Sequence, residues 1–349
     1  MITLGIETSC DETAVALVRD GVEILSSIVL SQVASHRPFG GVVPEIAARE
    51  HVRNILPVIA SAEKASGVAR QDIDLVAVTE RPGLKAALLS GLAAADAIAL
   101  ALGIPVVGVN HIEAHLVAPF LAAGREPIYP LVSLVVSGGH THLFLSEAWD
   151  QHTVLGATLD DAAGEAFDKV AKMLHLAYPG GPAIEASART GDAAALALPR
   201  PLLSEESLDF SFSGLKTAVS YACLERAPNG RPTGQLRAGV HVPDVAASFQ
   251  RAVVDVLDTK VRRALKQTGV KRLALGGGVA CNGPLRERLR LTAEELGVEF
   301  WLAPGALCTD NAAMVAARGY EVYTRSRGEV PPLSISSRAT WPRLPASVS

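Results

Sequence analysis

Closely spaced cysteines are missing from this chain. Its four cysteines stand far apart, at Cys10, Cys223, Cys281 and Cys308, and no C-x-x-C pair occurs. Paired cysteines build zinc ribbons, and dense cysteine sets build small disulfide frameworks. Both classes of protein are therefore excluded.

An excess of positive charge is also missing. Lysine and arginine number 32 against 36 aspartates and glutamates, which gives a formal net charge of −4. A protein that holds nucleic acid through its overall field carries a clear positive excess. Nucleic-acid binding would therefore need a basic partner or a local patch, for which these residues are the candidates: Arg81, Lys85, Arg262, Arg263, Lys266, Lys271, Arg272, Arg286, Arg288 and Arg290.

Neither an apolar run of membrane-spanning length nor a basic leader before the first apolar stretch is found. We therefore expect a cytoplasmic protein without membrane contact. Aromatic residues make up only 5% of the chain, whereas 49% of its residues are hydrophobic and 30 are glycine. This composition suits helices packed tightly on sheets, and 349 residues correspond to two domains or one large one.

Two histidines, His111 and His115, follow an apolar run at 104–109 that reads as a strand. If a helix begins at Asn110 or His111, residues four apart share one face and their imidazoles can hold one metal ion. The alternative is an amphipathic helix whose histidines merely lie near the core. At the carboxyl end of a strand, the spacing favours the metal site.

A zinc protease is a competing interpretation, because such enzymes carry H-E-x-x-H with the glutamate beside the first histidine. Here the glutamate is Glu113, about 200° around the helix from the histidine face. It cannot act as base for a metal between them, so a third ligand must come from elsewhere. Asp310, at a predicted helix start, is either that carboxylate ligand or an ordinary N-cap.

Strands are predicted at 2–7, 13–18 and 22–29, and the polar turn between the first two resembles the first phosphate-binding hairpin of the actin, Hsp70 and sugar-kinase superfamily. Strands and helices then alternate, which implies parallel crossovers. After a boundary near residues 124–127 a similar hairpin recurs at 131–145, indicating an internal duplication.

A third glycine-bearing strand end lies at 273–278, before a predicted helix at 283–296. Glycines there let the backbone approach a ligand closely, although a tight turn alone would also use them. Two polar segments allow a structural as well as a functional interpretation. The acidic face around Asp168 is also typical of a solvated helix face, and residues 210–217 are also typical of an N-capped helix start.

Several motifs together resemble one family. They are His111-Ile112-Glu113-Ala114-His115, Val136-Ser137-Gly138-Gly139-His140-Thr141, Gly164-Glu165-Ala166-Phe167-Asp168-Lys169, Tyr178-Pro179-Gly180-Gly181, Phe210-Ser211-Phe212-Ser213-Gly214-Leu215-Lys216-Thr217, Gly277-Gly278-Val279-Ala280-Cys281-Asn282 and Cys308-Thr309-Asp310-Asn311. In order and content they resemble the TsaD family, the bacterial tRNA N(6)-adenosine threonylcarbamoyltransferases once called glycoproteases.

The resemblance implies an α/β fold of the actin-like (ASKHA) type, with duplicated RNase-H-like domains and a nucleotide cleft between them. The halves would be 1–125, completed by a helix at 310–323, and 126–309, followed by a poorly ordered tail at 324–349. It also implies one divalent metal, most often iron(II) with zinc as the alternative, held by His111, His115 and Asp310.

The implied reaction moves threonylcarbamoyl from threonylcarbamoyl-AMP to the N6 amine of adenosine 37, in tRNAs reading codons that begin with adenine. Implied partners are tRNA, a TsaB-like paralogue, a TsaE-like ATPase and a TsaC-like enzyme that supplies the intermediate. The implied substrate-binding residues are Val135, Val136, Ser137, Gly138, Gly139, Asp168, Gly181 and Asn282. For the base that takes the amine proton, Asp11 and Glu12 stay open as alternatives.

The chain departs from the family pattern in one loop, where Arg81, Lys85 and Ala86 replace the usual Gly, Val and Gly. Two other functions are compatible with much of this sequence pattern. An actin-like kinase or ATPase would have the fold without needing the histidine pair, and a non-catalytic scaffold would need no metal ligands.

Overall fold

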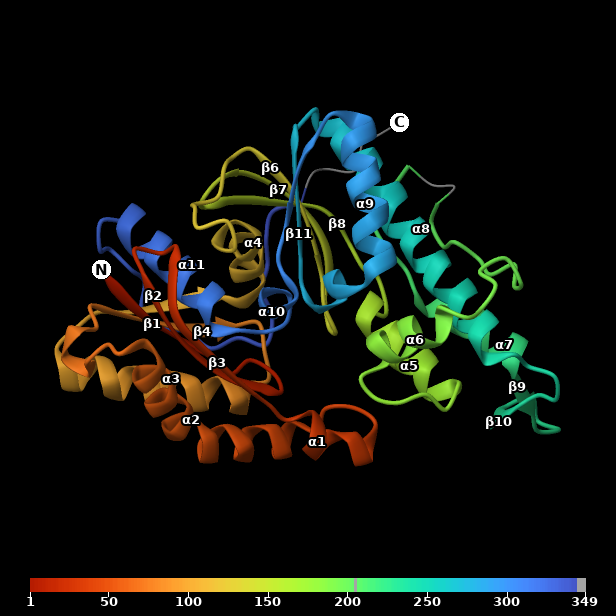
Figure 1. Cartoon of the computed structure of the whole chain (residues 1–349), viewed down its shortest axis with the longest axis horizontal. Helices are drawn as coiled ribbons and strands as arrows, with labels where there is room; N and C mark the ends of the chain where they lie inside the picture. The colour runs from red at the N-terminus through yellow and green to blue at the C-terminus, as the bar shows by residue number, and fades with distance from the viewer. Residues whose placement is uncertain (204–205, 344–349) are drawn as a thin grey trace. The chain divides into compact units, whose positions relative to one another are not determined.

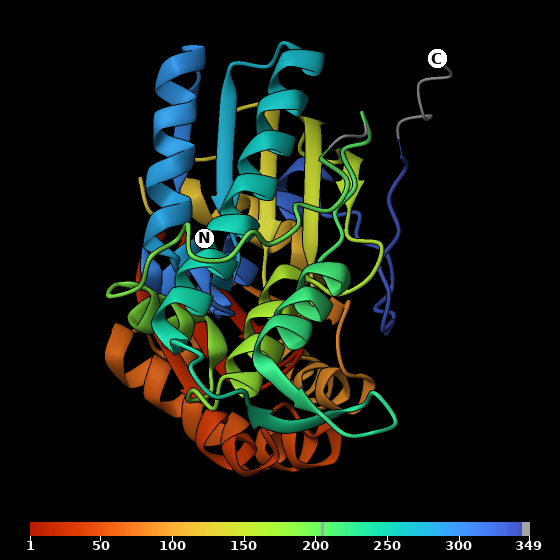
Figure 2. The same cartoon turned by 90° about the vertical axis from the view of Figure 1, so that its right-hand side faces the viewer.

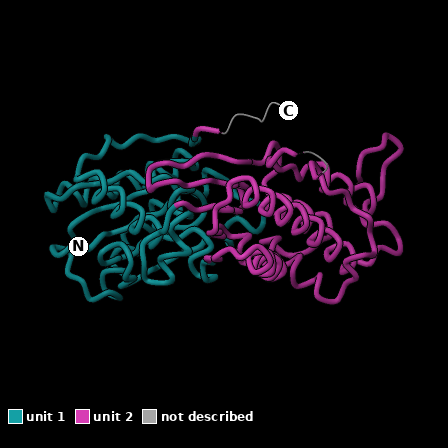
Figure 3. The backbone as a smooth tube through the Cα atoms, turned by 90° about the horizontal axis from the view of Figure 1, so that it is seen from above, with its two compact units in different colours: residues 1–129, 302–341 teal, residues 130–301, 342–349 magenta. Residues whose placement is uncertain are grey.

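The computed structural model describes residues 1–203 and 206–343. The chain divides into two compact units (Figure 3). Unit 1 comprises Met1–Tyr129 and Leu302–Trp341, and unit 2 comprises Pro130–Trp301 with the chain from Pro342 onward. Each unit is built on its own five-stranded sheet.

The sheet of unit 1 has the order β3-β2-β1-β4-β5. Its strands are β1 (Ile2–Glu7), β2 (Glu12–Arg19), β3 (Glu23–Ser31), β4 (Leu75–Arg81) and β5 (Val106–Asn110). The first three strands pair antiparallel, and β1, β4 and β5 pair parallel. The strands and crossovers predicted for this part of the chain are therefore confirmed.

Helices cover both faces of this sheet (Figure 1). On one face lie α2 (Pro44–Ser66) and α3 (Lys85–Leu102), and on the other lies α11 (Ala312–Arg325), which packs beside α4 (His111–Leu121). Strand alternation separates the two layers: Leu4 and Ile6 join the core under α2 and α3, whereas Gly5 faces α11. A Cβ at Gly5 would lie 2.2 Å from the Ala312 carbonyl oxygen, so this glycine lets the start of α11 reach the sheet.

Helix α3 (Lys85–Leu102) is the one helix of the described residues long and apolar enough to cross a membrane by length and composition. This differs from the expectation that no run of that length occurs. In the structure α3 packs against α2 and β4, with Leu88, Leu92 and Ala95 buried. Its apolar character is thus used at least in part for the core of unit 1.

The sheet of unit 2 repeats the arrangement of the first, with the order β12-β11-β6-β7-β8. Its strands are β6 (Leu131–Val136), β7 (Thr141–Ala148), β8 (Gln151–Ala157), β11 (Arg272–Gly276) and β12 (Glu299–Leu302). As in unit 1, an antiparallel meander, β6-β7-β8, is extended by a parallel strand, β11. The predicted internal duplication is confirmed.

The helices of unit 2 include α8 (Val242–Thr268), which the sequence analysis did not predict, and α9 (Gly283–Leu296), which it did. The two run side by side (Figure 2). The remaining elements of the chain are α1 (Val33–His36), α5 (Ala163–Met173), α6 (Gly180–Ala188), α7 (Ser213–Cys223), the hairpin strands β9 (Leu224–Arg226) and β10 (Pro232–Leu236), α10 (Gly305–Cys308), and 3-10 turns at Arg37–Phe39, Arg70–Asp72 and Gly278–Cys281.

The segment after α11 was expected to be poorly ordered. The Ser334 N–H donates to Glu80 Oε2 at 2.8 Å, and the Trp341 Nε1–H donates to Glu113 Oε1 at 3.1 Å. Leu333 and Ile335 pack against the core of unit 1. Residues 333–341 therefore have defined partners, which departs from the expectation, while residues 344–349 lie outside the described part of the chain.

A half-buried histidine on β7, His142, should make folding of unit 2 sensitive to acid. Burial, helped by the positive charge of Arg343, lowers the pKa of His142 to about 4. In the unfolded chain a histidine titrates near pH 6.5, so below that pH only the unfolded state takes up this proton. Stability is then lost as the pH falls from about 6.5 towards 4. Linkage gives a loss of about 2 kcal/mol between pH 7 and pH 5.

Urea unfolding at pH 7 and pH 5 tests this for the chain and for His142→Gln. The variant should lack most of that acid-dependent loss. The same loss in both proteins would show that His142 takes up its proton equally in the folded and unfolded states.

Candidate functional site

The helix that carries the histidine pair has a defined start. The Asn110 side-chain oxygen accepts the N–H groups of Ile112 and Glu113, at 3.0 and 3.4 Å, and so caps α4. The helix then begins at His111, at the carboxyl end of β5. His111 and His115 lie one turn apart, with ring centroids 4.8 Å apart and planes at 83°.

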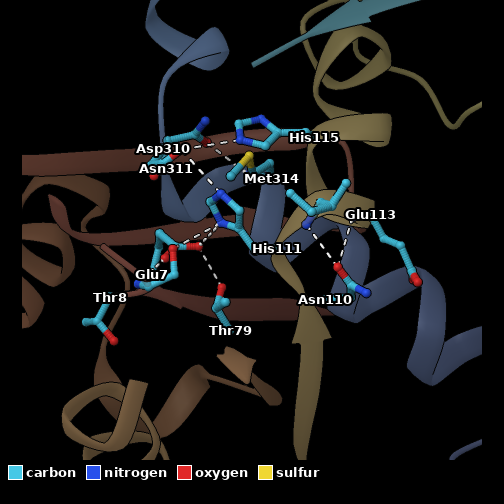
Figure 4. A network of polar contacts seen from close by, with 12 residues as sticks. Glu7, Thr8, Thr79, Asn110, His111, Glu113, His115, Asp310, Asn311 and Met314 are labelled. Atoms are coloured by element: carbon cyan, nitrogen blue, oxygen red, sulfur yellow. Dashed lines mark hydrogen bonds and ion pairs between the residues drawn. The ribbon is translucent and has the colours of Figure 1, made fainter. Parts of the chain in front are cut away.

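Asp310 completes this group from the start of α11 (Figure 4). Its Oδ1 lies 3.4 Å from His111 Nε2 and 3.3 Å from His115 Nε2. The N-cap of α11 is the next residue, Asn311, whose side chain accepts the Met314 N–H at 3.0 Å. The alternative interpretation of Asp310 as the cap is therefore wrong, and its carboxylate faces the histidines.

These three side chains fit a metal ion. One ligand atom from each of His111, His115 and Asp310 lies within 4.8 Å of the others. Donor atoms about 2.1 Å from one metal, at angles between octahedral and tetrahedral, are about 3.0 to 3.4 Å apart. Both measured nitrogen–oxygen distances lie in or close to this range. Two imidazoles and one carboxylate also leave coordination positions open for a substrate.

Glu7, which the sequence analysis did not single out, supports the first histidine. Its Oε2 accepts from His111 Nδ1 at 2.9 Å and from the Thr79 hydroxyl at 2.6 Å, and its Oε1 accepts the Ser9 N–H. A proton held on Nδ1 leaves Nε2 of His111 to face Asp310 and a metal. In the sequence the only signal for Glu7 is its position at the end of the first predicted strand, because the order of β1, β4 and β5 comes from the sheet itself.

Charge is balanced within this group. Burial alone would lower the pKa of His111, but Asp310 and Glu7 together raise it well above its ordinary value. Burial likewise opposes ionisation of Asp310, yet the histidines hold the pKa of its carboxyl well below the usual range. Burial lowers the pKa of His115. The carboxylates of Glu7 and Asp310 thus favour positive charge at this position, which a metal ion would also bring.

Replacing Glu7 by glutamine should weaken metal binding by about 10- to 100-fold, because a ligand histidine would lose the carboxylate that orients it. The affinity is measured by calorimetric titration of the metal-free chain and of the variant with Zn²⁺. Thr79→Val removes only one hydrogen bond to Glu7 and should have a smaller effect. Unchanged affinity in Glu7→Gln would show that the orientation of His111 does not depend on this carboxylate.

Glu113 lies on the opposite face of α4, as predicted. Its Oε2 accepts from Arg318 Nη2 at 2.8 Å, and Arg318 Nη1 donates to Glu321 at 2.7 Å. Arg318 is buried, with 3% of its surface exposed. Glu113 is therefore a structural partner of α11 rather than a base beside the metal, which excludes the zinc-protease arrangement.

The two candidate bases lie in the first turn of unit 1, at Asp11 and Glu12. Burial, followed by the charges of Asp310 and Asp11, raises the pKa of Glu12 to about 9. The Ser31 hydroxyl donates to Glu12 Oε1 at 3.3 Å. Without metal, Glu12 therefore holds its proton at neutral pH. A cation on Asp310 would remove part of the cause of this shift.

Unit 2 holds the predicted substrate loop, which follows buried Val135 and Val136 at the end of β6. A Cβ on Gly164, the second residue of α5, would lie 2.5 Å from the Ser137 carbonyl oxygen. A Cβ on Gly277, whose φ is +90°, would lie 2.4 Å from the Val136 carbonyl oxygen. These glycines let α5 and the turn after β11 approach the loop, whereas Gly138 and Gly139 have open space where a Cβ would be.

The other predicted substrate-binding residues of unit 2 are Asp168 on α5, Gly181 on α6 and Asn282 at the start of α9. Asp168 Oδ1 accepts the Gly180 N–H at 2.7 Å, at the start of α6, and Gly181 follows with open space where a Cβ would be. Asn282 caps α9 through the Leu285 N–H at 3.1 Å, and its Nδ2 donates to Gln250 at 2.8 Å. The structure therefore brings these residues into one connected part of unit 2 and gives Asp168 and Asn282 structural partners.

The segment at 210–217 is capped differently from the prediction. Helix α7 starts at Ser213 after Phe212, which makes no side-chain cap. Instead, Asp160 Oδ1 accepts the N–H groups of Phe212 and Ser213, at 2.8 and 3.1 Å. Lys216, on the first turn, pairs with Asp161 at 2.6 Å.

Comparison with known proteins identifies the family. The profile of TsaD, tRNA N6-adenosine threonylcarbamoyltransferase, matches residues 23–317. The chain belongs to this family. It is 53% identical over 341 residues to the tRNA N6-adenosine threonylcarbamoyltransferase of Pelobacter propionicus, covering 98% of this chain and 97% of the relative. It is 47% identical to that of Sorangium cellulosum, covering 99% and 98%.

Solved structures agree with this fold. HypF of T. kodakarensis matches with a TM-score of 0.60 at 15% identity, covering 93% of this chain and 48% of HypF. Component A of the (R)-2-hydroxyglutaryl-CoA dehydratase of Acidaminococcus fermentans matches with a TM-score of 0.52 at 16% identity, covering 93% and 99%. At such identity the likeness shows the fold alone, and it confirms the predicted actin-like α/β class.

The loop that departs from the TsaD pattern still approaches the metal side of unit 1. The Leu84 N–H donates to the Ser9 carbonyl at 2.8 Å, and a Cβ on Gly83 would lie 2.7 Å from the same oxygen. Arg81 pairs with Glu80 at 2.6 Å. The retained Gly83 therefore keeps the close approach, and Arg81 has a carboxylate partner beside it.

Proposed function

We propose that the chain transfers the threonylcarbamoyl group of threonylcarbamoyl-AMP to the N6 amine of adenosine 37, in tRNAs that read codons beginning with adenine, and that it acts in the cytoplasm. Family membership supports the transfer to tRNA adenosine. The observation that carries the proposal for this chain is its complete set of His111, His115 and Asp310. A scaffold without catalysis would not need such a set.

In this reaction the adenosine nitrogen attacks the carbamoyl carbon, a C–N bond forms, and the bond from that carbon to the AMP phosphate oxygen breaks. AMP leaves with the electron pair, and the amine proton passes to a base, for which Asp11 and Glu12 remain the candidates. The anhydride is already activated, so the protein mainly positions it and stabilises charge.

Iron(II) is the metal we propose at His111, His115 and Asp310, with zinc as the alternative. When bound, it supplies Lewis-acid stabilisation of negative oxygen. The N–H groups of Gly138 and Gly139 hold the phosphate or acyl end of the substrate, whereas the Ser137 N–H donates to the His140 carbonyl at 2.8 Å and positions the loop. This is supported by the open space beside both glycines.

The nucleoside end of the substrate is assigned to residues of unit 2 on α5, on α6 and between β11 and α9. We place the ribose hydroxyls at Asp168 and Gly181, and the adenine beside Asn282 and the turn at Gly277. The close approach of the Gly277 turn to β6 supports this, because only a turn without a side chain passes so near. TsaB-like, TsaE-like and TsaC-like proteins are the proposed partners.

The function is tested by mass spectrometry of nucleosides from unmodified tRNA, after incubation with threonylcarbamoyl-AMP, the chain and its partners. Threonylcarbamoyladenosine should appear only when the chain is present. Rapid ATP hydrolysis without any modified nucleoside would instead support an actin-like ATPase.

AMP should raise the unfolding temperature of the chain, because it binds only the folded state. Asp168→Ala and Asn282→Ala should weaken AMP binding in calorimetry, measured at a temperature where each variant is folded. Asp160→Ala is the matched control, since it also removes a helix cap in unit 2 but lies outside the proposed nucleotide site. Equal affinity in all three variants would place the nucleotide elsewhere.

A further inference from the structure

Half of the ten basic residues that the sequence suggested for tRNA have carboxylate partners in the structure: Arg81, Arg262, Arg272, Arg288 and Arg290. Three arginines of α8 and α9 pair with nearby carboxylates: Arg262 with Asp258 and Glu295, Arg288 with Asp258, and Arg290 with Glu287 and Glu294. Arg272 faces Glu299 at 3.4 Å. A phosphate would have to compete with these carboxylates, so these helices are poor candidates for the tRNA contact.

The hairpin β9–β10 differs in this respect. Residues 224–239 contain Arg226, Arg231 and Arg237 with a single acid, Glu225. Among the described residues, no carboxylate oxygen lies within 4.0 Å of any of these three guanidinium groups. In a chain of net charge −4, the hairpin is thus a local region of unneutralised positive charge.

The hairpin is also exposed and shaped by its own arginines. In β10, all residues but the last are exposed, and the hairpin extends beyond α7 within unit 2 (Figures 1 and 2). An isolated two-stranded hairpin is only marginally stable in water. Here Arg226 Nη1 donates to the Gly230 carbonyl at 2.7 Å, and Arg237 Nε donates to the Leu224 carbonyl at 3.0 Å, which ties the two strands together.

An aromatic ring adjoins these charges. The Arg226 guanidinium lies 3.6 Å from the centroid of the Tyr221 ring, and Tyr221 is 59% exposed. Exposed aromatic rings and guanidinium planes are the surfaces on which proteins stack unpaired RNA bases, while further arginines bind the phosphates. Tyr221 and the three arginines combine both features.

The hairpin is connected directly to the proposed substrate region. It follows α7, whose first turn is held by Asp160 and Asp161 just before α5. The 11 residues of α7 span about 16 Å. The hairpin therefore lies about one short helix from the part of unit 2 that contains Asp168, close enough to bind the same RNA but not the reacting amine.

We propose that Tyr221, Arg226, Arg231 and Arg237 form a tRNA-binding site, in which the arginines contact phosphates and Tyr221 with Arg226 stacks an unpaired base. This rests on the proposed function, which makes tRNA the substrate. The site acts on binding of tRNA and leaves the chemical step unchanged once tRNA is bound.

Arg231→Gln is the sharpest test, because within the described part of the chain the Arg231 side chain makes no hydrogen bond or ion pair that shapes the hairpin. Binding of unmodified tRNA to the full chain is measured by fluorescence anisotropy between 50 and 200 mM salt. Loss of one phosphate contact should reduce the slope of log K against log salt by about 0.7 to 1, and weaken binding about fivefold near 0.1 M. Tyr221→Leu should weaken binding with an unchanged slope, and Tyr221→Phe should retain it.

Arg290→Gln is the matched control, because Arg290 is an exposed arginine of the same unit that has carboxylate partners. It should leave both affinity and slope nearly unchanged. In the transfer reaction Arg231→Gln should raise KM for tRNA and keep kcat. If Arg231→Gln binds tRNA like the unsubstituted chain while threonylcarbamoyladenosine still forms, the hairpin proposal is overturned and the proposed function stands. If no nucleoside is modified by the unsubstituted chain, the proposed function itself fails.

Discussion

Asp310→Ala should lose its metal and its transferase activity while it stays folded. The variant removes one of only three protein ligand atoms, so metal affinity should fall by more than the roughly 100-fold that outer contacts cost. The fold should persist because Asn311, and not Asp310, caps α11. Elemental analysis after dialysis, together with nucleoside mass spectrometry, measures both effects.

Asn311→Ala separates the ligand from the cap. It should reduce the free energy of unfolding by about 1 kcal/mol, the usual cost of losing an N-cap, but it should keep the metal. Full metal occupancy in Asp310→Ala would remove Asp310 from the site. Loss of metal in both variants, with unfolding of α11, would mean that the effect comes from the helix start and not from the carboxylate.

Arg318→Met should lower the free energy of unfolding by about 3–5 kcal/mol, because it leaves buried carboxylates without their counter-charge. Arg318 lies between Glu113 on α4 and Glu321 on α11; Arg318 and Glu321 are buried, with Glu321 6% exposed, and the Glu113 side chain is 19% exposed. The same pairs fix α4 against α11. Since the proposed metal ligands lie on α4 and directly before α11, metal affinity should fall as well.

Urea unfolding provides the measurement, and Arg290→Met provides the exposed control, for which a change of no more than about 1 kcal/mol is expected. A triple variant with Glu113→Leu, Arg318→Met and Glu321→Leu should recover much of the loss, since apolar groups can replace a buried ion network. A loss as small as that of the exposed control would show that the network contributes little to folding.

The histidine pair and its spacing were readable from the sequence because helix geometry is local. His111 and His115 share a face in any helix that starts at His111, and Glu113 must then point away. Strand alternation and the two hairpins also indicated the duplicated sheets. Helix α8 is also indicated by local spacing, since Val245, Phe249 and Val256 follow a helical period, although it was not among the predicted helices.

Other parts of the site depend on contacts between distant segments. Glu7 reaches His111 only because β1 and β5 flank β4 in a parallel sheet, an order that neighbouring residues do not encode. Gly5 allows α11 to approach, 307 residues away at Ala312. Charge at a surface is likewise a matter of partners: Arg288 on α9 pairs with Asp258 on α8, 30 residues away, which neighbouring residues do not show.

What the sequence by itself determined is the histidine pair on one helix face and the fold class, because both follow from short-range periodicity and from motifs that occur together. The tertiary structure alone decided that Asn311 is the cap and Asp310 faces the histidines, that the Glu7 carboxylate contacts His111, and that Arg318 joins α4 to α11. Each of these depends on side chains that meet through packing of separate elements, and the free energy of such contacts has no counterpart in local sequence.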